Sequence, residues 1–442
     1  MEIRNLYEKP ISIAPLITFR VIFGAMMAFS AIRFMALGWI EDHFIRPKFH
    51  FKYFGFFWVE VLPDFYLYAI HILMIISALG VMLGAFYRLS AVLLFLTFTY
   101  TELLDLTYYL NHYYFVSIVC GLLIFLPANR CFSVDVLLKP QIYSEFVPAW
   151  TINILKFQLG IVYFYAGIAK INEDWLFHAL PLKIWLPAND QLFLIGNLLK
   201  YEATAYFFSW TGMLYDCTIV FFLIYPKTRF LAYLAVIFFH VITGLMFQIG
   251  VFPLVMIGST LIFFSEKWHW RWIDFLCRKI NFSLLKDSKK QKNFVLKPIV
   301  LFFLGVHIIF QILFPFRHLF YDGNLFWTEE GYRFSWRVML MEKAGTATFY
   351  VKDSKTGREG EVVNADFLNP HQEKQMAMQP DMILQFAHFL ADHYAKKGIY
   401  KPEVRAEIYV TLNAKPSRLL VDPSIDLSKI EDTFEQKMWI LK

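Results

Sequence analysis

Nine long apolar stretches separated by short polar segments fill most of the first 316 residues of this 442-residue chain. A helix that crosses a bilayer needs about 20 mostly apolar residues, and most of these stretches have that length. The third, fourth and eighth are shorter, so we expect them to be tilted, tightly paired or partly re-entrant. The predicted spans cover residues 15–38, 65–87, 89–104, 112–127, 151–171, 203–225, 230–249, 251–265 and 296–316.

The hydrophobic pattern changes after about residue 320. Residues 346–363 alternate between apolar and polar positions around a Lys-Thr-Gly turn, and residues 403–411 alternate again, which predicts strands. Residues 380–397 have the spacing of an amphipathic helix entered through a Pro-Asp pair. We therefore predict a polytopic α-helical membrane bundle of about nine spans (1–317), followed by a small external α+β domain (318–442).

Composition and charge agree with a membrane protein and suggest its orientation. Hydrophobic residues make up 58% of the chain and aromatic residues 19%. Basic residues are concentrated in 266–297, and the loops that carry Arg88, Arg130 and Lys227 fall on the same side. Because cytoplasmic loops are enriched in Lys and Arg, we expect a cytoplasmic N-terminus and an external C-terminal domain. The predicted external loop 41–64 is an exception to this rule, since it also carries basic residues.

Other site classes have little support in the sequence. The four cysteines lack the spacing of a zinc site or a disulfide framework, so no metal site is expected. Nothing in the sequence indicates binding to nucleic acid.

Polar residues form a narrow stripe on the fifth predicted span. At 100° per residue, Tyr163, Gly167, Lys170 and Asp174 fall on one face. Ionisable residues inside spans are costly and are candidates for function, and Gly167 is expected to leave room beside Lys170 for a flat ligand. The alternative is a lysine whose amine reaches the membrane interface beside Trp175.

A second polar group joins the third and fourth spans. Asp105, Asn111 and His112 surround several tyrosines, an arrangement that also suits an interfacial turn with an aromatic belt. Two further signals are weaker. His240 in the seventh span and Asp216 in the sixth are candidates for a site, or for ordinary hydrogen bonds between helices.

Several blocks of the chain, in order over roughly residues 10–430, resemble the vitamin K-dependent γ-glutamyl carboxylase family, whose membrane domain is of the HTTM type. The most specific is the IVYFYAGIAKI block of the fifth span. The blocks are FRVIFGAMM (19–27), ALGVMLGAFYRLSAVLLFL (78–96), LLDLTYYLNHYY (103–114), PANRCFSVDVLL (127–138), QLGIVYFYAGIAKINEDW (158–175), FFHVITGLMFQIG (238–250), WTEEGYRFSWRVMLMEK (327–343) and FYVKDSKTGREGEVVNADFLNP (349–370).

The resemblance implies an enzyme that couples oxygenation of vitamin K hydroquinone to its 2,3-epoxide with carboxylation of glutamate to γ-carboxyglutamate. In that family a lysine at the position of Lys170 deprotonates the hydroquinone, and an Asn-His pair matching Asn111 and His112 acts on the quinone. Asp105 and His240 also match family positions. O2 and CO2 are then co-substrates, a glutamate-containing peptide or protein is the partner, and Tyr163 and Gly167 are expected to border the quinone.

For the glutamate substrate we expect contacts at the start of the external domain, from Trp327, Arg333, Trp336 and Arg337. An arginine there can hold a carboxylate through two hydrogen bonds. The alternative is that this aromatic run docks the domain onto the bundle.

The chain is shorter than animal members of the family, so the resemblance is to a bacterial-type member in a plasma membrane, where menaquinol is the expected quinol. Two rival functions stay open. One is a naphthoquinol epoxidase that does not carboxylate peptide. The other is a non-catalytic quinone-binding membrane protein.

Overall fold

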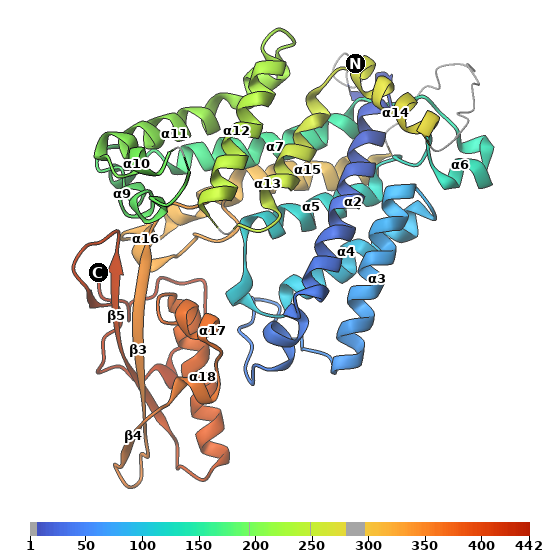
Figure 1. The fold of residues 1–442 in the computed structure, drawn as a ribbon. Coiled ribbons are helices and arrows are strands. Elements are labelled where there is room, and N and C mark those ends of the chain that lie inside the picture. The colour runs from blue at the N-terminus through green and yellow to red at the C-terminus, as the bar shows by residue number, and fades with distance from the viewer. Residues whose placement is uncertain (1–6, 194, 248, 280–296) are drawn as a thin grey trace.

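The computed structural model describes residues 7–193, 195–247, 249–279 and 297–442. Helices predominate, and a small α/β unit lies at one end of the helical bundle (Figure 1). The helices of the bundle are α2 (Ala14–Ala36), α3 (Asp64–Leu83), α4 (Tyr87–Leu103), α5 (Asn111–Phe125), α6 (Val134–Leu138), α7 (Trp150–Ala169), α8 (Glu173–Leu176), α9 (Leu182–Trp185), α10 (Gly196–Leu199), α11 (Glu202–Ile224), α12 (Arg229–Met246), α13 (Phe252–Thr260), α14 (Glu266–Lys279) and α15 (Pro298–Leu313).

All nine predicted spans correspond to helices. Six of the described helical runs are long and apolar enough to cross a membrane: α2, α3, α7, α11, α12 and the run Pro298–Phe320 that begins with α15. The three segments expected to be short are short, since α4 has 17 residues, α5 has 15 and α13 has nine. The protein is therefore an integral membrane protein by its helices, while nine complete crossings stay a prediction.

Small residues allow neighbouring helices of the bundle to pack closely. A Cβ atom on Gly24 of α2 would lie 2.6 Å from the backbone nitrogen of Met82 in α3. Close backbone approach of this kind is typical of helix pairs in lipid, where association depends on packing rather than on the hydrophobic effect. A short antiparallel pair, β1 (Pro10–Ser12) with β2 (Phe146–Pro148), joins the starts of α2 and α7.

The C-terminal unit is a four-stranded antiparallel sheet with two helices against it. The strand order is β4 (Glu359–Glu361), β3 (Lys343–Lys352), β5 (Glu403–Leu412) and β6 (Arg418–Leu419). Alternate residues of β5 are buried and face α18 (Pro380–Lys396), whose Phe386 and Leu390 are also buried. The remaining helices are α16 (Leu325–Thr328) and α17 (Pro370–Met376). The predicted strands and amphipathic helix are thus confirmed, and the external location stays a prediction.

The α/β unit contacts the bundle through the segment between α4 and α5. The Gln372 side chain donates a hydrogen bond of 2.7 Å to Asp105, and the Asn111 amide donates one of 2.8 Å to the Arg337 carbonyl. Trp336 is completely buried and stacks on Tyr114 of α5, with 4.8 Å between ring centroids. These contacts hold the two parts together along one side of a large cleft.

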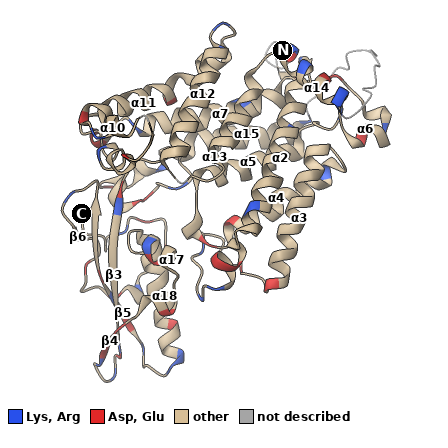
Figure 2. Ribbon diagram, viewed as in Figure 1, with Lys and Arg blue, Asp and Glu red and all other residues tan. Residues whose placement is uncertain are grey.

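Basic residues lie on both the bundle and the C-terminal unit, and the expected orientation stays a prediction. Figure 2 shows Lys and Arg residues on α14 and beside α6, away from the β-sheet. Residues 280–296, which carry much of the predicted cytoplasmic charge, lie outside the described residues.

Candidate active site

A buried ion pair joins the two central helices of the bundle. Lys170 directly follows α7, is 6% exposed, and places its Nζ atom 2.7 Å from Oδ2 of Asp216 in α11. The amine also donates to the Ala166 carbonyl at 3.2 Å and lies 5.3 Å from the centre of the Trp175 ring. Lys170 is therefore not a surface lysine that reaches the membrane interface. It shares a desolvated pocket with a carboxylate.

The expectation of room beside Gly167 is wrong, because α11 fills that space. A Cβ atom at this position would lie 2.6 Å from Sγ and 2.7 Å from the backbone nitrogen of Cys217. The missing side chain instead lets α7 and α11 approach closely enough for Lys170 to reach Asp216.

Tyr163 and His240 also form a buried pair. The Tyr163 hydroxyl lies 2.9 Å from Nε2 of His240, which joins α7 to α12. The Nδ1 atom of His240 is buried and has no hydrogen-bond partner among the described residues. The His240 ring contacts Phe252 at 5.6 Å between centroids, and Phe252 contacts His112 at 5.1 Å on its other side. A single phenylalanine therefore separates this cluster from the cleft.

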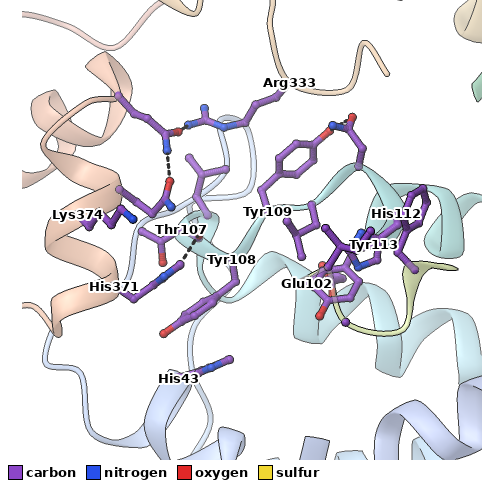
Figure 3. Close-up of a pocket in the computed structure, with 18 of the residues that line it drawn as sticks. His43, Glu102, Thr107, Tyr108, Tyr109, His112, Tyr113, Arg333, His371 and Lys374 are labelled. Atoms are coloured by element: carbon purple, nitrogen blue, oxygen red, sulfur yellow. Dashed lines mark hydrogen bonds between the residues drawn. The ribbon is translucent and has the colours of Figure 1, made fainter. Parts of the chain in front are cut away.

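The cleft between the bundle and the α/β unit has a volume of about 1220 Å³. Asn111 and His112 line it from the bundle, and Arg333 and Arg337 line it from the segment that leads into β3. Figure 3 shows His112 beside Tyr113, with His371 and Lys374 across the pocket. Burial raises the pKa of Tyr108, which also lines the cleft, to about 12, so its phenol is neutral at ordinary pH.

Hydrogen bonds hold the side chain of Asn111 in place, whereas the side chain of His112 is free. Asn111 donates to the Arg337 carbonyl, and its own oxygen accepts a hydrogen bond of 3.1 Å from the Tyr109 hydroxyl. No hydrogen bond is found for the His112 ring among the described residues, although His112 is mostly buried. Its ring nitrogens are therefore available to a ligand in the cleft.

Asp105 does not line the cleft. One of its oxygens accepts from the backbone and hydroxyl of Thr107, at 2.9 and 2.7 Å. The other lies 2.7 Å from the Gln372 amide and 3.2 Å from Nδ1 of His50. All of these partners belong to the protein, so Asp105 shapes the segment before Asn111 rather than offering oxygens to a ligand.

The two candidate arginines differ in availability. Arg333 is bound to Asp381 and Gln379, and although burial opposes its charge, Asp381 raises the pKa of Arg333 above its ordinary value. Burial lowers the pKa of Arg337, whose guanidinium contacts the His318 ring at 3.1 Å and has no carboxylate partner among the described residues. Arg337 is thus the one of the two that is free to bind an anion.

The two candidate tryptophans lie in packed regions rather than on the cleft wall. Trp336 is the fully buried ring against Tyr114. Trp327 is 2% exposed and donates a 2.7 Å hydrogen bond from its indole to the Leu441 carbonyl. For these two residues the structure favours the docking interpretation over direct contact with substrate.

Three ionisable residues near the site were hard to identify from the sequence. Asp216 was only a weak candidate, and Lys343 and Glu102 were not candidates. Asp216 was visible as an acid inside an apolar span, but its lysine partner lies 46 positions away. Lys343 is buried, makes a 2.7 Å ion pair with Glu329, and lines the cleft, yet it reads as the polar start of a strand. Glu102 faces the cleft from the last turn of α4, and no sequence motif marks it as a candidate.

Two family models match nearly the whole chain. The HTTM domain matches residues 8–268, and the lumenal domain of vitamin K-dependent gamma-carboxylase matches residues 296–442. No solved structure matches the chain. The second match includes α15 as well as the α/β unit. Because the first match covers more than half of the chain and the second covers its C-terminal part, this chain belongs to the vitamin K-dependent gamma-carboxylase family.

Proposed function

We propose that this protein couples oxygenation of vitamin K hydroquinone, or menaquinol, to its 2,3-epoxide with carboxylation of glutamate side chains to γ-carboxyglutamate. The observation that carries the proposal is the shared cleft. Asn111 and His112, from the part matched by the HTTM domain, face the same space as Arg337, from the part matched by the lumenal domain.

The residues of the cleft fit a flat, apolar quinol with polar edges. Its walls carry the rings of Tyr108, Tyr113 and Phe252, and His112 has free ring nitrogens. Ligand sites of this kind combine aromatic walls with a few polar groups that orient the ligand. When bound, the hydroquinone would supply, through its reaction with O2, the strong base that glutamate carboxylation requires. His112 and Asn111 would orient its hydroxyl groups.

The Lys170–Asp216 pair is the proposed source of a base for the quinol. An ammonium cannot accept a proton, so Lys170 must first pass one to Asp216, across the 2.7 Å contact. This transfer would leave a neutral amine beside a neutral acid, without the two charges that burial penalises. A lysine whose amine is neutral is a suitable general base.

Lys170 lies behind the cleft rather than on its wall, so the proposal includes a path between them. Trp185 and Phe247 line the cleft and pack in the same apolar cluster as Ala169 and Trp175, the neighbours of Lys170. Movement of these two rings would join the amine to the cleft.

Arg337 is the proposed anchor for the substrate glutamate. An arginine with free N–H groups in a partly desolvated cleft can bind a carboxylate by two parallel hydrogen bonds. CO2 would enter the same space, since carbon–carbon bond formation requires both at one place. The protein substrate would approach from the α/β unit, which we place outside a bacterial plasma membrane, with the N-terminus in the cytoplasm.

One reaction separates this function from its rivals. Purified protein in detergent is incubated with vitamin K hydroquinone, O2, labelled CO2 and a glutamate-containing peptide. Epoxide together with labelled peptide supports the proposal. Epoxide without label identifies an epoxidase, and neither product, with retained quinone binding, identifies a quinone-binding protein.

A further inference from the structure

A second cavity meets the cleft along a boundary that includes Glu102. This lateral groove, of about 970 Å³, is lined by α4, α5 and α15 and by parts of the α/β unit. Phe125, Phe303 and Phe310 on its wall are exposed on the apolar surface of the bundle, where lipid would lie. Glu102 lines both the groove and the cleft.

Glu102 is the uncommitted acid at this boundary. Glu329 also lines both cavities, but it is paired with Lys343 at 2.7 Å. For Glu102 neither a hydrogen bond nor an ion pair is found among the described residues. An apolar wall makes a bare carboxylate costly unless cations or donors compensate it, so this position suits a carboxyl that exchanges protons.

Aromatic groups line both cavities beside Glu102, and the basic lining residues include Arg33 in the cleft and Arg333, which is paired with Asp381, at the boundary. Figure 3 shows Glu102 beside Tyr113 and His112 in the cleft. Tyr113 and Arg33 line the cleft together with Glu102, and Tyr53 lines the groove together with Glu102. The Arg33 guanidinium is over the Trp39 ring at 4.7 Å and has no carboxylate partner among the described residues.

The chemistry of the proposed reaction requires more than one proton acceptor. Conversion of a hydroquinone to a quinone epoxide turns two C–O–H groups into two carbonyls, so both O–H bonds must break. Lys170 has one amine and therefore accounts for one of these protons at a time. The second proton needs another acceptor that can reach the cleft.

We infer that Glu102 is a second proton-transfer residue of the reaction, and this inference rests on the proposed function. One carboxyl oxygen takes the proton that leaves a quinol hydroxyl, whose electron pair stays on the quinol oxygen. The other oxygen releases its proton to water in the cleft. The two transfers together leave the carboxyl neutral, so no bare charge stays in the apolar wall.

The first test compares Glu102→Gln, which keeps the shape but exchanges no protons, with Glu102→Asp and with Asp42→Asn as a control. Asp42 lines the same cleft and pairs with Arg46. In Asp42→Asn, Arg46 still has a second acidic partner, Glu41. In Glu102→Gln the kcat of epoxidation should fall by on the order of 10², with the KM for quinol within about twofold. Glu102→Asp should recover part of the rate, and Asp42→Asn should lower kcat far less than Glu102→Gln does. An unchanged kcat in Glu102→Gln, or a change confined to KM, overturns the inference.

The second test does not depend on turnover. Infrared difference spectra are recorded between oxidised and reduced naphthoquinone bound to the wild-type protein and to Glu102→Gln. A carboxyl C=O band that responds to quinone reduction, shifts in D2O and disappears in Glu102→Gln supports the inference. If that band is present but no epoxide forms, the proposed function fails and Glu102 still exchanges protons with the quinone. If epoxide forms but the band is missing, Glu102 has no such role.

Discussion

The Nζ atom of Lys170, which directly follows α7, lies 2.7 Å from Oδ2 of Asp216 in α11, and both residues are almost completely buried. A buried ion pair adds little net stability when it is compared with apolar residues of the same size, but breaking it leaves an uncompensated charge. The pair therefore makes predictions for stability as well as for activity.

Asp216→Asn should lower the free energy of unfolding by about 3–5 kcal/mol, because the Lys170 ammonium loses its partner in a desolvated place. The double variant Lys170→Met/Asp216→Leu should be clearly more stable than Asp216→Asn. Unfolding of the purified protein in mixed detergent measures both. Asp190→Asn is the control, since it breaks a half-exposed 3.1 Å pair with Lys200 and should cost at most about 1 kcal/mol. Equal costs at the two sites would contradict the burial argument.

Lys170→Ala should abolish epoxide formation while the protein stays folded, because the variant lacks the proposed base. A small primary amine added to the reaction should restore part of the rate by entering the space that the side chain leaves. Lys156→Ala, in the first half of α7, is the matched control and should retain activity. Epoxide formation at the wild-type rate in Lys170→Ala would exclude this residue as the base.

Arg337→Ala should weaken carboxylation of peptide by about 2–5 kcal/mol if the guanidinium binds the substrate carboxylate in a desolvated ion pair. Epoxide formed without peptide should change much less, so both products are measured in one reaction. A proportional loss of the two products would show that Arg337 serves both steps.

Arg333→Ala should act on stability instead. Burial favours the neutral acid at Asp381, but Arg333 outweighs it and holds the pKa of Asp381 below its ordinary value. Removal of the guanidinium leaves that carboxylate buried without its partner, so the α/β unit should unfold more easily, as measured by limited proteolysis. A stable variant with a selective loss of carboxylation would instead make Arg333 a substrate contact.

The stack of His43 on Tyr108, with 3.9 Å between ring centroids, predicts a pH dependence of stability. Burial, assisted by His371, lowers the pKa of His43 from 6.5 to about 4. Between these values the unfolded chain binds more protons than the folded one, so stability should fall as the pH drops from about 6.5 to about 4. His43→Phe keeps an aromatic ring in the stack and should flatten the unfolding free energy over this range. An unchanged pH profile would mean that other groups cause the dependence.

Labelling with a membrane-impermeant thiol reagent should test the orientation in intact cells. Cysteine introduced at Lys355, in the exposed turn between β3 and β4, should react, whereas cysteine at Lys227, between α11 and α12, should react only after lysis. The native cysteines are buried or partly buried, and the parent chain measures their background. The reverse pattern would place the cleft on the cytoplasmic side.

The sequence by itself determined where the nine apolar helices lie, the strands and amphipathic helix of the C-terminal unit, and the family. These features depend on local periodicity and on contiguous motifs, so residues close together in the chain are sufficient. The polar stripe that contains Lys170 was visible for the same reason, and so was the Asn111–His112 pair.

The tertiary structure alone decided which polar groups are free. Asp105 resembled a ligand in the sequence, but its oxygens are occupied by Thr107 and by Gln372, which lies 267 positions away. Gly167 suggested an opening, but α11 fills that space. Arg333 and Arg337 look alike in the sequence, but in the structure only Arg333 of the two forms an ion pair with Asp381. A hydrogen bond or ion pair between distant segments leaves no periodicity in the sequence. For that reason the pairing of Lys170 with Asp216, and the open position of Glu102, required the folded chain.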